Sequence, residues 1–205
     1  MGYHLRSLTW ATLPDAPSVC VDCVFWQSRE GRPTAKARWA EHVEEEWGPW
    51  GTLYLGDGDR LAGFIQYGPA DFFPRAHELP AGPPSPDAVL ITCAYLVDPS
   101  SPWVMQSLFL SAIGEARDRK ARALETFGYR YPEGSSAADR FLVHRTVFPS
   151  DFLADFGFVA ARTEGRVELA RLELGGLVPV EEGGFARAWR RAKDLAAPTP
   201  VPERF

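Results

Sequence analysis

Long apolar runs, basic clusters and cysteines are all scarce in this chain of 205 residues. No apolar run approaches the roughly 20 residues that a membrane-spanning helix needs, and the first residues lack the apolar core of a signal peptide. The net charge is −5 and no basic cluster is long, which argues against nucleic acid as a main partner. The 3 cysteines lack the spacing of a disulfide framework and fit a reducing compartment. These absences predict a cytoplasmic protein with no membrane partner and no nucleic-acid partner.

What the chain does contain is a strand, a long helix and a second strand in succession. Residues Ala88–Val97 are typical of a buried strand, and Ala121–Phe127 are typical of another. Between them, Ser101 and Pro102 mark the start of an amphipathic helix. Such a crossover places two parallel strands side by side. The first N–H groups of the helix could bind a pyrophosphate, although Trp103 stands where a glycine would allow the closest approach.

Shorter patterns surround this unit and complete one domain. Strands and helices are expected before it, and a hairpin turn at Gly56–Asp59 joins two of the strands. These strands are Tyr3–Thr9, Thr52–Leu55 and Leu61–Tyr67, and the helices are Ser18–Trp26 and Ala35–Trp47. Pro69–Pro86 is irregular, contains Phe-Phe-Pro and is expected to be a packed loop. Arg166–Leu174 is typical of a last strand, and Phe185–Leu195 of a short helix before a Pro-rich tail.

Three passages within Tyr3–Leu174 resemble the GNAT superfamily of acetyl-CoA-dependent N-acyltransferases. They are Tyr95–Pro99 before the long helix, Glu115–Glu125 at its end and in the next strand, and Asp151–Phe158, a short helix that closes on Gly-Phe. The resemblance implies an α/β (α+β) fold with a mixed, mostly antiparallel sheet of about six to seven strands and about four helices. In that fold the strands at 88–97 and 121–128 splay apart. The resemblance also implies a GNAT-like acyltransferase domain over residues 1–174 and a C-terminal extension over 175–205.

The resemblance further implies acetyl-CoA as the cosubstrate and an amine of a small molecule, peptide or protein as the acceptor, in a protein that could form a homodimer. The residues expected to contact acetyl-CoA lie around the start of the long helix: Ala94, Leu96, Val97, Ser100, Ser101, Trp103, Val104 and Met105. The chain departs from the family pattern in two places. Ser101, Trp103 and Met105 stand where the family has an Arg or Gln and small residues. Leu153 stands where many members carry a Tyr that acts as general acid.

Glu125 and His144 are the candidate catalytic residues. Glu125 lies in the second strand among apolar residues, where a carboxylate must be paired or exposed. It could act as a general base for the amine or form a structural ion pair. His144 is expected near the CoA thiol by the resemblance, and its imidazole could move the amine proton, unless it is a surface histidine. Tyr129 and Tyr131 are alternative general acids.

Cys20-Val-Asp-Cys23 is the most distinctive short motif. Two thiols at this spacing can bind a metal, form a redox pair or pack in a core. The surrounding residues are strongly apolar and favour core packing. The remaining Cys and His residues show no paired spacing, so we expect no metal site.

Tryptophans gather in the N-terminal part of the chain, around the two expected helices: Trp26, Trp39, Trp47 and Trp50. In the resembled fold these helices wall the acceptor site. Aromatic walls suit an apolar, aromatic or cationic amine, and the alternative is that the indoles fill a core. The acidic residues Glu44–Glu46 could attract a cation or solvate a helix end.

We therefore expect an N-acetyltransferase. One alternative is a catalytically inactive GNAT-fold protein that binds a ligand or partner and has lost CoA binding. Trp103 discriminates between the enzyme and the inactive protein. An indole at the N-terminus of the helix would block a phosphate unless the indole points away. The second alternative is a metal or redox protein that uses Cys20 and Cys23.

Overall fold

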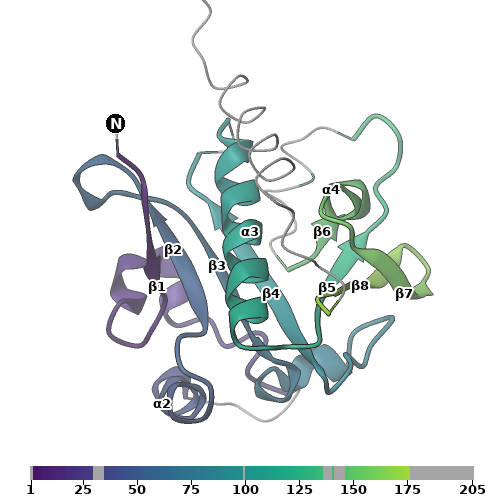
Figure 1. Ribbon diagram of the computed structural model, residues 1–205, viewed down its shortest axis with the longest axis horizontal. Helices are drawn as coiled ribbons and strands as arrows, with labels where there is room; N and C mark the ends of the chain where they lie inside the picture. The colour runs from purple at the N-terminus through teal and green to yellow at the C-terminus, as the bar shows by residue number, and fades with distance from the viewer. Residues whose placement is uncertain (1, 30–34, 99, 136–139, 141–145, 176–205) are drawn as a thin grey trace, which may run out of the picture. The chain divides into compact units, whose positions relative to one another are not determined.

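The computed structural model describes residues 2–29, 35–98, 100–135, 140 and 146–175 (Figure 1). The chain separates into two units, Met1–Leu174 and Gly175–Phe205. All elements described below belong to the first unit. The helix expected at Phe185–Leu195 lies outside the described residues.

Among the described residues, one sheet contains eight strands in the order β1-β2-β3-β4-β5-β8-β7, and β6 pairs with β5. The bounds are His4–Ser7 (β1), Gly51–Leu55 (β2), Leu61–Pro69 (β3), Ala88–Leu96 (β4), Ala123–Tyr129 (β5), Phe148–Pro149 (β6), Val159–Glu164 (β7) and Val167–Glu173 (β8). The β4–β5 and β5–β6 pairs are parallel and all other pairs are antiparallel. The predicted mixed, mostly antiparallel sheet is therefore confirmed.

Helices cover both faces of this sheet. The α-helices of the described part are Ser18–Val21 (α1), Lys36–Glu46 (α2), Pro102–Asp118 (α3) and Ser150–Asp155 (α4). The long helix α3 packs across β2, β3 and β4 (Figure 1). The predicted amphipathic helix is confirmed: of the apolar residues at helical spacing, Val104, Leu108, Ala112 and Ala116 are buried and Ile113 is partly buried. None of the described helices is long and apolar enough to cross a membrane.

The core lies in two layers, one on each face of the sheet. Ile65, Ile91 and Leu124 belong to the cluster that contains the buried residues of α3. Phe64 and Leu90 belong to a second cluster, which contains the buried residues of α2. This follows from the alternation of side chains along each strand. Gly63 allows α3 to approach β3, because a Cβ at this position would lie 2.8 Å from the Tyr95 carbonyl oxygen and 2.9 Å from Val104 Cγ1.

Several element boundaries differ from the sequence prediction, and one of them has a clear local reason. The strand expected from Ala121 begins at Ala123, because the Ala121 N–H still donates to the Ala116 carbonyl at the end of α3. The helix expected over Ser18–Trp26 ends at Val21. The long loop after β3 contains two short 3-10 helices, Ala70–Phe72 and Pro74–His77, and buries Phe73, Ala76 and Ala81. It is thus the packed loop that was expected.

The strands β4 and β5 splay apart, as predicted. They pair only from Ala88 opposite Ala123 to Ile91 opposite Thr126, although β4 continues to Leu96 and β5 to Tyr129. A bulge at this point supports the divergence, because Gln66 and Tyr67 of β3 face Cys93 and Ile91, which leaves Thr92 as the extra residue. We call the space between residues 92–96 of β4 and 127–129 of β5 the wedge.

Candidate functional site

The β4 side of the wedge presents main-chain hydrogen-bonding groups. The Val97 N–H donates to the Ala62 carbonyl of the β3 side at 3.0 Å. Because N–H and C=O groups alternate in direction along a strand, those of Ala94 and Leu96 point to the opposite edge, into the wedge. No strand of the described residues pairs with this edge beyond Ile91. The side chains of Ala94 and Leu96 are buried on the α3 face, so only their main chain is available to a ligand.

The β5 side of the wedge is lined by β6. Gly128 and Tyr129 pair in parallel with Phe148 and Pro149. Because β8 occupies the other edge of β5 up to Tyr129, β6 lies on the wedge side. Phe148 is buried, and its ring centroid lies 4.9 Å from that of Phe109 in α3. The wedge is thus narrowed from the β5 side, while no strand of the described ranges pairs with the β4 edge beyond Ile91.

The start of α3 carries a carboxylate that sequence reasoning did not single out. The Asp98 carboxylate accepts hydrogen bonds from the Ser100 N–H at 2.9 Å and from the Ser100 and Ser101 hydroxyls at 2.7 and 3.1 Å. These bonds, those of Ser100 first, lower the pKa of Asp98 and keep it ionised at neutral pH. The two hydroxyls expected to bind phosphate are therefore engaged by an anion at the positive end of the helix dipole. The short Asp-x-Ser pattern could have indicated this turn.

The indole of Trp103 points away from the wedge. Its ring centroid lies 4.9 Å from that of Tyr3 and 5.6 Å from that of Tyr54, next to β1 and β2 at the far side of the sheet from β5. The side chains of Val104 and Met105 are buried in the core. The first turn of α3 could therefore contact a cofactor through its main chain, and the indole does not obstruct it.

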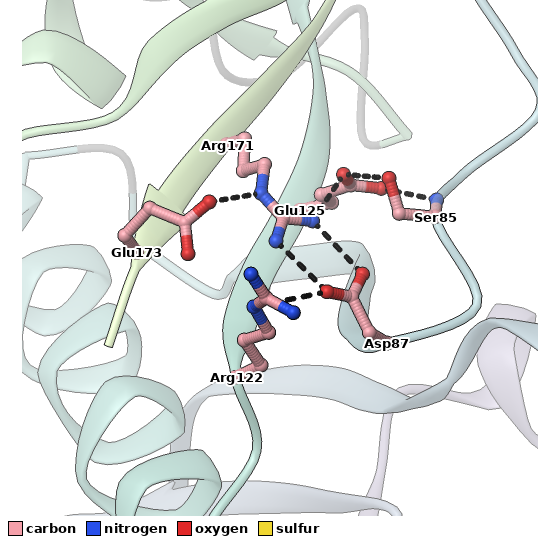
Figure 2. Close-up of polar contacts among 6 residues, drawn as sticks. All are labelled: Ser85, Asp87, Arg122, Glu125, Arg171 and Glu173. Atoms are coloured by element: carbon pink, nitrogen blue, oxygen red, sulfur yellow. Dashed lines mark hydrogen bonds and ion pairs between the residues drawn. The ribbon is translucent and has the colours of Figure 1, made fainter. Parts of the chain in front are cut away.

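Glu125 lies in a buried polar network rather than in the wedge (Figure 2). Its side chain is 0% exposed, and it faces Leu90, within the part of β5 that pairs with β4. One carboxylate oxygen accepts hydrogen bonds from the Ser85 hydroxyl at 2.7 Å and from Arg171 Nη1 at 3.0 Å. The other accepts the Ser85 N–H at 2.7 Å. All three partners are donors, which is the arrangement of a structural ion pair.

Arg171 of β8 joins this pair to the surface. It contacts the Asp87 carboxylate at 3.2 Å and Glu173 at 2.6 Å, and Arg122 lies 3.5 Å from Asp87 (Figure 2). The hydrogen bond from Arg171 lowers the pKa of Asp87. The network ties β5 and β8 to the loop before β4. Sequence reasoning predicted that Glu125 would be paired or exposed, but nothing in the sequence pointed to Arg171.

The other catalytic candidates are placed only in part. His144 lies outside the described residues. The ring centroids of Tyr129 and Tyr131 are 4.8 Å apart, and the Tyr131 hydroxyl donates to the Arg140 carbonyl at 3.2 Å. Leu153, at the position of the family tyrosine, is buried in the core on the α3 face.

The N-terminal tryptophans are mostly core residues. Trp26, Trp39 and Trp50 are buried, and the Trp50 indole N–H donates to Glu44 at 3.0 Å. Glu44, one of the acidic residues at the end of α2, is therefore bound to a buried core residue. An open cavity of about 380 Å³ does lie beside α2, and it is lined by Gln27, Trp39, His42, Glu46, Asp71, Phe72 and Pro74. Aromatic and acidic side chains therefore line a cavity in this part of the chain.

No protein-family model and no curated protein matches the sequence. Solved structures match the fold. The proposed acetyltransferase yncA from Salmonella typhimurium, solved with its cofactor acetyl-CoA, is 14% identical with a TM-score of 0.50, over 88% of this chain and 99% of that one. A proposed acetyltransferase from Acinetobacter baylyi ADP1 is 13% identical with a TM-score of 0.50, over 88% of this chain and 95% of that one. A proposed GNAT-family acetyltransferase from Desulfovibrio desulfuricans is 16% identical with a TM-score of 0.46, over 84% and 99%. At these identities the two matches with a TM-score of 0.50 show the fold alone, and the chain has the GNAT-like fold that its sequence predicted.

Proposed function

We propose that this protein transfers the acyl group of acetyl-CoA to an amine of a small molecule or peptide. The observation that carries the proposal is the wedge, in which β4 offers the main-chain groups of Ala94 and Leu96 along an edge without a strand partner in the described part of the chain. An extended chain containing amides, such as the pantetheine arm, can add to such an edge as a further strand. The first N–H groups of α3, at Trp103–Met105, then lie at the end of that edge for the pyrophosphate.

In this proposal the protein works mainly by holding two reactants in place. Bound acetyl-CoA would supply an activated acyl group as a thioester. The β4 edge would fix the direction of the acyl group. The fixed orientation of the amine toward it would supply much of the rate of acyl transfer. We assign no proton transfer to Glu125, because its oxygens already accept hydrogen bonds from Ser85 and Arg171. Release of CoA from acetyl-CoA that depends on an added amine tests the proposal.

A second candidate function is a GNAT-fold protein that binds a ligand without catalysis. One observation favours it: the Asp98 carboxylate stands at the start of α3, where a pyrophosphate would otherwise find bare N–H donors. The two candidate functions differ in how this carboxylate affects the binding of acetyl-CoA.

Replacing Asp98 with Asn is expected to tighten acetyl-CoA binding about fivefold at low salt, the size expected for removing one like charge about 4 Å from a phosphate in water. The amide keeps the shape of the side chain and removes its charge. Calorimetric titration at two salt concentrations measures the effect, which should shrink as salt rises. Asp118→Asn is the matched control, because Asp118 ends the same helix at its other end. If Asp98→Asn binds acetyl-CoA with unchanged or weaker affinity, the phosphates of acetyl-CoA do not bind next to Asp98.

A further inference from the structure

The three cysteines and one lysine meet at a single small cavity, a connection that the sequence does not reveal. Cys20, Cys23 and Cys93 line a cavity of about 30 Å³ together with Lys36 of α2. All three cysteines are reduced thiols. Such a volume is about that of one water molecule. The Cys20-x-x-Cys23 motif therefore has a cationic neighbour from another element and a third thiol from β4.

Lys36 lines this cavity, and its ammonium contacts a carbonyl and two indole rings. Its Nζ donates to the Cys23 carbonyl at 2.9 Å and lies 4.9 and 5.2 Å from the ring centroids of Trp39 and Trp50. None of the described residues that line the cavity is Asp or Glu. Burial lowers the pKa of Lys36, and the neighbouring thiols Cys93, Cys23 and Cys20 oppose that effect. A buried cation is stabilised by a nearby anion, and here the thiols are the groups that can become one.

The thiols differ in access. Cys93 is the least suited to react, because burial raises its pKa to about 12 and keeps it protonated. Cys23 is exposed, and its N–H donates to the Cys20 carbonyl at 3.3 Å, so the two residues share one turn. An exposed thiol that lines a cavity with a lysine ammonium, and whose main-chain carbonyl accepts a hydrogen bond from that lysine, has a second thiol close by in the chain. A cation near one thiol and a second thiol near it are the features of a reactive cysteine and its resolving partner.

We propose that Cys23 is a peroxide-reactive cysteine whose thiolate is stabilised by the Lys36 ammonium and which is resolved by Cys20. The Cys23 thiolate attacks one oxygen of a peroxide, so that an S–O bond forms and the O–O bond breaks. The leaving oxygen takes a proton and departs as water or an alcohol, and Cys23 becomes a sulfenic acid. The Cys20 sulfur then attacks the Cys23 sulfur, an S–S bond forms, and the hydroxyl leaves as water with the Cys20 proton. Two thiols are oxidised to one disulfide and one peroxide is reduced.

A metal site is the competing use of three thiols. The described residues include no group of three or more Cys, His, Asp or Glu placed to hold a metal ion. The Lys36 cation in the same cavity would also repel a metal ion. Thiol chemistry therefore fits this cavity better than metal binding.

The proposal predicts the reactivity of the reduced full chain. Iodoacetamide at neutral pH, followed by peptide mass spectrometry, should alkylate Cys23 before it alkylates Cys93. Hydrogen peroxide should convert Cys20 and Cys23 into one disulfide, and in Cys20→Ser it should leave a sulfenic acid on Cys23 that dimedone traps. Lys36→Met should slow both the alkylation of Cys23 and its reaction with peroxide about tenfold. Arg38→Met, which removes an exposed cation of the same helix, should change neither.

The wild-type peroxide reaction decides the matter even if Lys36→Met does not fold. If hydrogen peroxide oxidises Cys23 no faster than it oxidises free cysteine, the proposal is overturned, because the thiol would then gain nothing from its site. A disulfide that involves Cys93 instead of Cys20, or a folded Lys36→Met variant with unchanged rates, would overturn it as well.

Discussion

Replacing Arg171 with Met is expected to lower the free energy of unfolding by about 3–5 kcal/mol, because it leaves a buried carboxylate without its cation. Glu125 is 0% exposed and Arg171 is 17% exposed, so water cannot take the place of the guanidinium. Ser85 would remain as the partner of Glu125, with a hydroxyl and one N–H. Urea unfolding at neutral pH measures the change.

The control for this variant is Arg122→Met. Arg122 contacts the same Asp87 carboxylate, but its side chain is 77% exposed, so its loss should change stability by about 1 kcal/mol or less. Adding Glu125→Met to Arg171→Met should restore most of the stability, because the pair is then replaced by apolar groups. If Arg171→Met alone is as stable as Arg122→Met, the network is not the structural unit described above. A restored double variant that still transfers acyl groups would remove Glu125 from the catalytic candidates.

Replacing Phe109 with Ala should cost about 3–5 kcal/mol, the usual range for a fully buried phenyl ring. Phe109 is 0% exposed, and its ring lies 4.9 Å from Phe148, 5.1 Å from Phe152 and 5.5 Å from Phe156, measured between centroids. These contacts hold β6 and α4 against α3. We therefore expect the variant to loosen the β5 side of the wedge and to weaken acetyl-CoA binding as well.

Phe25→Ala is the matched control for Phe109→Ala. Phe25 is 38% exposed and packs on Trp26, which belongs to a different core cluster from Phe109. Its loss should change stability by about 1 kcal/mol and leave acetyl-CoA affinity unchanged. Thermal unfolding and calorimetric titration report the two effects separately. A Phe109→Ala variant that is destabilised but binds acetyl-CoA as the wild type does would show that the aromatic cluster does not shape the wedge.

The fold could be predicted from the sequence because its central unit is local. The apolar run Ala88–Val97, the amphipathic helix that begins at Pro102 and the next strand follow one another in the sequence, and a parallel pair needs such a crossover. The splay at Ile91 follows from the GNAT resemblance. The bulge at Thr92 does not, because it depends on the register with β3.

The site was less predictable because its contacts join residues far apart in the sequence. Glu125 and Arg171 are separated by 46 positions and meet only through the register of β5 with β8. Cys93 and Lys36 likewise meet the Cys20-x-x-Cys23 motif only in the folded chain. The orientation of Trp103 was left open by the sequence, and its contact with Tyr3 and Tyr54 settles it.

The central claim, that the wedge serves acyl transfer, is tested most directly by the release of CoA from acetyl-CoA by the purified full chain. Small amines and short peptides are added in turn, and CoA is quantified by chromatography, because protein thiols would react with a thiol reagent. The account predicts release that requires an amine and saturates with acetyl-CoA. Saturable binding of acetyl-CoA without amine-dependent release would support the non-catalytic candidate instead. The absence of any binding at millimolar acetyl-CoA, in the wild type and in Asp98→Asn alike, would contradict the account.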